Sequence, residues 1–142
     1  MIVEDRLIQR HLSAWYNLRQ HLEESSDPLT DVANFFSKLP KVKIYTDPYD
    51  PSTWPTPWEL ISENEYCQFN QILGICYTLQ LTERFKNCQP KINVSIDSVN
   101  KTVYYLLFVE DKVYGYDDVW IDAKDLPKSL KTQKIYPMKQ LH

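Results

Sequence analysis

The residue with the clearest chemical potential in this sequence is Cys67, which follows a signal for the start of a helix. Ser62 and Glu65 have the spacing of a capping pair, and this predicts a helix that begins within a residue or two of Glu65. Cys67 would then lie in the first turn or just after it, where the partial positive charge of the helix end favours a thiolate. Cysteine hydrolases combine such a thiol with a histidine base and an orienting acid.

Candidates for those other two groups are few. The three histidines are His11 and His21, both on a predicted N-terminal helix, and His142 at the end of the sequence. Either of the first two could serve as a base only if that helix packs over the start of the cysteine helix. Asp117 and Asp118 could supply a triad acid or a metal pair, but beside a glycine they are also typical of a turn. The cysteine itself has a plainer alternative role, as a small hydrophobe on a core helix.

Two tryptophans lie in the segment before the cysteine helix. Trp54 and Trp58 lie beside Thr56, Pro57 and Glu59, which have the order of a capping box with proline at the first helical position. This pattern predicts a short additional helix. The two indoles could line a groove for a substrate or peptide, or they could brace the proline-rich loop against the cysteine helix.

The composition of the 142-residue sequence excludes several kinds of partner. A net charge of −3 argues against nucleic acid, because the neutralisation of phosphates needs a concentrated basic surface. Only two glycines occur, which excludes a glycine-rich phosphate loop, and we expect no cofactor. The three cysteines have no metal-type C-x-x-C spacing, so we expect reduced thiols and no metal site.

Hydropathy and aromatic content favour a protein that binds other proteins. No apolar run is long enough to span a membrane, and residues 1–20 carry charges throughout, so we expect no membrane partner, no secretory signal and synthesis in the cytoplasm. Aromatic residues make up 13% of the chain, more than one small core usually buries. We therefore expect part of them on a surface that contacts other protein subunits.

The N-terminal part of the sequence, residues 1–40, is predicted to be helical. Apolar residues recur every three or four positions from Ile2 to Glu24, which is typical of an amphipathic helix. Asp27 and Pro28 have the types expected at the N-cap and first position of a second helix, which Pro40 ends.

The hydrophobic period changes to two after residue 90, which indicates strands. Lys91–Asp97, Thr102–Val109 and Val113–Tyr116 predict an antiparallel meander, with a fourth short strand at Val119–Asp122 as an option. We expect one α+β domain over residues 1–142, in which the N-terminal helices and the central cysteine helix pack on a sheet of three to four strands. Residues 41–125 would form its core, and residues 126–142 an irregular tail with an edge strand as an option near Ile135.

The order of these features resembles the bacterial transglutaminase-like cysteine proteinases, of the wider papain-like and transglutaminase-like fold. The resemblance covers roughly residues 47–120, where a tryptophan and T-P-x-E precede a cysteine helix and strands that end in an acid. The matching residues are Trp54, Thr56, Pro57, Glu59, Leu60, Cys67, Asp117 and Asp118. The resemblance implies a cysteine nucleophile at the helix start, with a histidine base on a following strand.

Two departures from that family argue against catalysis. Family members surround the cysteine with glycine and acidic residues, whereas here the segment around Cys67 reads E-Y-C-Q-F. On the strand where the family carries its histidine, this chain has Tyr104 and Tyr105. A tyrosine is a poor general base at neutral pH, and the loss of a base typically costs at least ~10²–10⁴-fold in rate. With Trp54 and Trp58, these tyrosines are candidates for a binding surface instead.

The sequence therefore favours a degenerate transglutaminase-like domain, a pseudoenzyme that serves as a structural or protein-interaction module. The alternative is an active cysteine amidase or peptidase that uses Cys67 as nucleophile with an unusual base. The small size, the two glycines and the abundance of tyrosine, asparagine and lysine resemble small proteins of tailed bacteriophages. A role in a virion or in its assembly is thus a further hypothesis.

Overall fold

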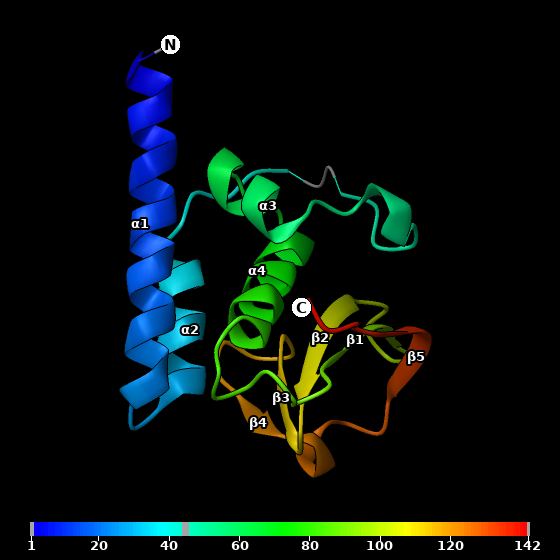
Figure 1. Cartoon of the computed structure of the whole chain (residues 1–142). Helices are drawn as coiled ribbons and strands as arrows, with labels where there is room; N and C mark the ends of the chain where they lie inside the picture. The colour runs from blue at the N-terminus through cyan, green and yellow to red at the C-terminus, as the bar shows by residue number, and fades with distance from the viewer. Residues whose placement is uncertain (1, 44–45, 142) are drawn as a thin grey trace.

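The computed structural model describes residues 2–43 and 46–141, in which four α-helices accompany a five-stranded sheet (Figure 1). The helices are α1 (Ile2–Glu24), α2 (Pro28–Ser37), α3 (Pro57–Glu63) and α4 (Gln68–Gln80). Helix α4 lies at the centre, because it packs on α2 and α3 on one side and on the sheet on the other. The predicted α+β class is confirmed, and the strands follow the helices as the change of hydrophobic period indicates.

Helix α1 has the predicted bounds and only part of it packs on the body of the protein. Its C-terminal half buries Trp15, Leu18 and Leu22 against the other helices. Its N-terminal half extends past the rest of the chain (Figure 1). No helix among the described residues is both long enough and apolar enough to cross a membrane.

The capping box predicted before α3 is present. The Thr56 hydroxyl accepts a hydrogen bond from the Glu59 backbone N–H (3.3 Å), and the Glu59 carboxylate accepts one from the Thr56 backbone N–H (2.9 Å). Pro57 takes the first helical position, where its missing N–H leaves no donor unsatisfied. These reciprocal bonds fix the start of α3.

Replacing Thr56 with alanine should lower the free energy of unfolding by about 1 kcal/mol, because the backbone N–H of Glu59 at the helix start loses its hydrogen-bond partner. Urea denaturation of the purified protein measures this change. Thr56→Ser keeps the hydroxyl and should stay within about 0.5 kcal/mol of wild type. Equal losses in both variants would contradict a capping role for the hydroxyl.

The cysteine helix begins three residues after Glu65, one residue beyond the predicted range. Ser62 lies inside α3, and Asn64 ends that helix in the left-handed conformation with φ 53°. The next residues stay extended because Tyr66 pairs through its backbone with the chain at Lys41, where its N–H donates to the Pro40 carbonyl (3.2 Å). Helix α4 can therefore begin only at residue 68.

The sheet has the strand order β4-β3-β2-β1-β5, and every neighbouring pair is antiparallel. The strands are β1 (Lys91–Asp97), β2 (Val103–Val109), β3 (Lys112–Tyr114), β4 (Ile121–Asp122) and β5 (Leu130–Pro137). The predicted meander and its optional fourth strand correspond to β1 through β4. Val109 and Lys112 pair across the tight turn between β2 and β3.

The fifth strand confirms the optional edge strand near Ile135, and it corrects the predicted sheet of three to four strands and the otherwise irregular tail. Strand β5 pairs with β1 along the whole of β1, with an irregularity between Val94 and Ser95. Its side chains are exposed or half-buried from end to end. An edge strand of this kind needs no alternation of apolar residues, so its sequence carries no periodic signal.

The core surrounds α4, between the other helices on one side and strands β1 and β2 on the other. Almost every residue of α4 after Gln68 is buried. Gly74 permits a close approach, as its position inside a helix predicts, because a Cβ there would overlap the Phe36 ring of α2. Helix α4 is thus enclosed on all sides, and its two ends are the places where it can present side chains to a site.

Candidate functional site

Cys67 is the N-cap of α4, so it lies just before the first turn of the helix, and the prediction that it stands at the helix start is correct to within a residue. Its side chain makes no capping hydrogen bond, while its carbonyl accepts the Gln71 N–H at 3.0 Å. The side chain is only 1% exposed and belongs to the hydrophobic core. The structure therefore gives the thiol the position of a nucleophile and the surroundings of a core residue.

Tyr105 on β2 approaches the start of α4 from the sheet, where it lines a small pocket together with Gln68. Burial raises the pKa of Tyr105, and electrostatic repulsion from Tyr49 and Cys67 contributes less to the same shift. Its ring also meets Phe69 of α4 edge-on, with the ring centroids 5.3 Å apart. A phenol therefore occupies the place on β2 where the family resemblance implies a histidine.

Tyr104 does not share this position. Successive side chains of a strand point to opposite faces of the sheet. Tyr104 accordingly lies on the other face, where its ring centroid is 5.1 Å from that of Tyr116. Of the two tyrosines on the predicted base strand, only Tyr105 faces α4.

The structure separates the two candidate binding tryptophans. Trp54 donates its indole N–H to the Asp47 carbonyl (2.9 Å), and its ring lies 5.0 Å from Phe69 and 4.9 Å from Tyr136 between centroids. It thus joins the loop before α3 to α4 and β5. Trp58 instead turns towards α1, where it meets Trp15 edge-on at 5.0 Å and remains 54% exposed.

The described histidines both lie on α1, whose main contacts are with α2 and α3. His21 Nε2 is 2.9 Å from Asp31 Oδ2, and the Ser25 hydroxyl donates to the same oxygen. The hydrogen bonds from Ser25 and His21 lower the pKa of Asp31. This cluster fastens α1 to α2. His11 lies farther towards the free end of α1, and His142 lies outside the described residues.

Asp117 and Asp118 lie at a small pocket beside the start of α4. The Asp117 carboxylate accepts the backbone N–H of Asp118 (2.9 Å), which is the turn geometry that the sequence predicts. The pocket holds about 80 Å³ and is lined by Gln68, Gln71, Ile72, Tyr105, Tyr114, Gly115, Asp117 and Asp118. Small-molecule sites usually occupy ~300–1,000 Å³, so this pocket is too small for a substrate.

The residues that the sequence analysis singled out for a cysteine site are gathered at one end of α4, with the exception of the histidines. The cysteine at the start of α4, the facing residue on β2 and the acids after β3 all lie at one end of α4. A neutral phenol with a raised pKa donates a hydrogen bond but accepts no proton from a thiol at neutral pH. The arrangement suits packing better than proton transfer.

Tyr49 and Tyr136 are neighbours of this site that sequence reasoning missed. Burial, followed by the charges of Asp47, Tyr49 and Asp50, raises the pKa of Tyr136, which places the loop at residues 46–50 beside β5. Tertiary packing alone brings this loop to the site, so no local motif could have identified it.

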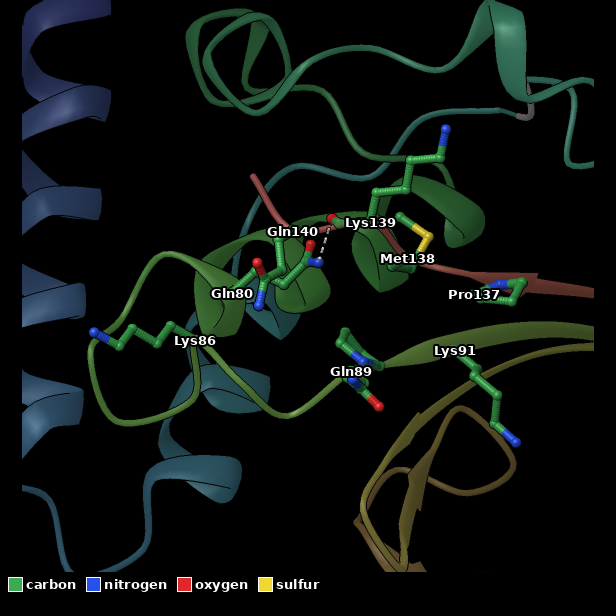
Figure 2. Close-up of a pocket in the computed structure, with 9 residues that line it drawn as sticks. Gln80, Lys86, Gln89, Lys91, Pro137, Met138, Lys139 and Gln140 are labelled. Atoms are coloured by element: carbon green, nitrogen blue, oxygen red, sulfur yellow. Dashed lines mark hydrogen bonds between the residues drawn. The ribbon is translucent and has the colours of Figure 1, made fainter. Parts of the chain in front are cut away.

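A second pocket lies at the opposite end of α4 (Figure 2) and holds about 400 Å³. Its lining includes Lys86, Lys91 and Lys139, and Gln80 donates to the Lys139 carbonyl at 2.9 Å. Figure 2 shows the three lysine side chains pointing away from one another. They therefore assemble no convergent cationic site.

Solved structures of Legionella pneumophila LapG share this fold. One superimposes with a TM-score of 0.64 at 16% sequence identity, over 94% of this chain and 85% of LapG. The EGTA-treated form gives a TM-score of 0.64 at 16% identity over 96% and 86%, and the calcium-bound form gives 0.59 at 16% identity over 94% and 85%. No family model and no curated protein matches the chain.

The calcium-bound form of LapG raises the question of a metal site here. Among the described residues, no group of three or more histidine, cysteine, aspartate or glutamate side chains could hold a metal ion. What the likeness to LapG does establish is architecture: the chain has a LapG-like fold.

Proposed function

We propose that this chain is a non-catalytic domain with a transglutaminase-like fold that works through protein contacts, as a structural or assembly module. The observation that carries the proposal is Tyr105, which lies beside the start of α4, where it lines a pocket with Gln68 and its ring is 5.3 Å from that of Phe69. Both described histidines lie on α1, away from β2. The burial of Cys67 supports the same conclusion, because a nucleophile must be reached by its substrate.

The aromatic residues give this module a means of contact. Tyr16, Tyr49 and Trp58 are each about half exposed, with exposed fractions of 53%, 48% and 54%. Tyrosine and tryptophan contribute disproportionately to binding energy at protein interfaces. As the setting of these contacts we propose a virion, or its assembly, in a tailed bacteriophage, a role that rests on the two glycines and ten tyrosines of this small chain.

The reactivity of Cys67 towards iodoacetamide tests the loss of catalysis. We expect Cys67 in the folded protein to react at least ~100-fold more slowly than in the urea-unfolded protein, because a buried thiol reacts only when the structure opens locally. Mass spectrometry of tryptic peptides at successive times gives the rate for each cysteine. Half-buried Cys88 is an internal reference within the same molecule.

The opposite result would restore the alternative of an active amidase or peptidase. It would consist of rapid, selective modification of Cys67 in the folded protein, slowed by His11→Ala. Cys67→Ser identifies the modified peptide without ambiguity in either case.

A further inference from the structure

An arginine without an acidic partner lies among aromatic rings on the outer side of α1. The guanidinium carbon of Arg19 is 4.4 Å from the ring centroid of Trp15, 5.6 Å from that of Tyr16 and 5.8 Å from that of Trp58. Burial lowers the pKa of Arg19. Its Nε is buried without a hydrogen-bond partner, and no carboxylate among the described residues pairs with it. Arg19 is therefore a positive charge without an acidic partner in the part of the chain that the structure describes.

Arg19 ends a row of side chains that share one face of α1. The row, here called the α1 strip, consists of Asp5, Ile8, Leu12, Tyr16 and Arg19. Its spacings of three, four, four and three residues keep it on one face of a helix with 3.6 residues per turn. The acid is exposed, Tyr16 is 53% exposed and the other members are half-buried. Leu12 packs with part of its side chain against the protein's own hydrophobic core.

The spacing of residues along the α1 strip is symmetric about Leu12, so it is the same in both directions of the helix. Two copies of α1 in antiparallel contact, centred on Leu12, would place Leu12 against its own copy and Ile8 opposite Tyr16. The same register would place Asp5 of each copy opposite Arg19 of the other. We infer that the α1 strip is an isologous dimer surface whose partner is a second copy of this chain.

Charge and shape favour a second copy in this antiparallel orientation. The acid and the base of the α1 strip are complementary only when the helices run in opposite directions, because a parallel pair would oppose like charges. The N-terminal half of α1 extends past the body of the protein, which leaves room for a second helix (Figure 1). Trp58 flanks the base end of the α1 strip and would extend the contact.

This inference builds on the proposed function by giving the module a partner and a surface. A contact made by one helix face is smaller than the ~1,600 Å² of a standard stable interface, so we expect a dissociation constant on the order of 10–100 µM. The two proposals can fail separately, because the reactivity of Cys67 and the self-association of α1 are measured independently.

A cysteine on the two-fold axis gives the sharpest test of the inference. Leu12→Cys would face its own copy, so mild oxidation should link most of the protein into a disulfide dimer, which non-reducing electrophoresis detects. Asn17→Cys lies on the opposite side of α1 and should form at least about tenfold less dimer under the same conditions, since disulfides need Cα atoms within ~7 Å. Equal cross-linking of the two variants would overturn the pairing.

Charge reversal tests the register in the native protein. By sedimentation equilibrium, Asp5→Arg and Arg19→Asp should each weaken the dimer by about tenfold or more, because each opposes like charges. The double variant should return to within about threefold of wild type, as a mere loss of helix stability would not. A wild-type chain that stays monomeric up to about 0.5 mM would overturn the inference, because that concentration exceeds the expected dissociation constant.

Discussion

Replacing Trp15 with alanine should lower the free energy of unfolding by about 3–5 kcal/mol. The indole is 0% exposed, and its N–H donates a 2.8 Å hydrogen bond to the Thr78 hydroxyl of α4, 63 residues away in the sequence. Thr78 in turn donates to the Gly74 carbonyl (2.6 Å). The substitution therefore removes a large core side chain together with a hydrogen bond that joins α1 to α4.

Urea denaturation followed by circular dichroism measures the loss, and two variants assign it. Trp15→Phe keeps most of the apolar volume but not the N–H, so it should cost less than alanine, about 1–2 kcal/mol. Asn17→Ala changes an exposed neighbour on α1 and should stay within about 0.5 kcal/mol of wild type. If Trp15→Ala cost under about 1 kcal/mol, α1 would not be docked as described.

Gly115→Ala should destabilise the protein by about 3 kcal/mol or more. Gly115 has a φ of +117°, which side chains other than glycine rarely adopt, and a Cβ there would overlap the carbonyl oxygen of Tyr105. Because the clash is with backbone, no rotation of a side chain can relieve it. The substitution would push β2 and the turn after β3 apart at the site that faces Cys67.

The same denaturation experiment measures this loss, and the amide NMR spectrum shows where the structure changes. We expect the largest shifts at Tyr105 and its neighbours on β2. Asp118→Ala, an exposed position in the same turn, should leave the stability within about 0.5 kcal/mol of wild type. A Gly115→Ala protein as stable as wild type would contradict the close approach of Gly115 to Tyr105.

The features of the fold that sequence predicted correctly are those encoded by residues close together in the chain. The capping box at Thr56 and Glu59 depends only on two residues that are three positions apart in the sequence. The pair at Ser62 and Glu65 has the same local pattern, yet the backbone bonds of Tyr66 to a distant segment override it. Local signals thus hold unless a long-range contact competes for the same backbone.

In the candidate site, too, local signals were predicted correctly and long-range packing was not. Periodicity and capping signals placed Cys67 at a helix start and Tyr105 on the strand that faces it, because both positions follow from the order of elements. The separation of Trp54 from Trp58 could not be predicted, since it depends on where α1 and β5 pack. Arg19 was missed because the rings around it come partly from another helix.

The two edges of the sheet bear on how this protein avoids uncontrolled aggregation. An open edge strand is a template on which further strands can add. At one edge, β4 has only two residues, Ile121 and Asp122, and so offers little backbone for pairing. At the other, β5 carries Lys131 and Lys134 in exposed positions, and paired copies would bring these charges together. Both edges therefore oppose fibre growth, which directs any ordered self-association to the helical side of the molecule.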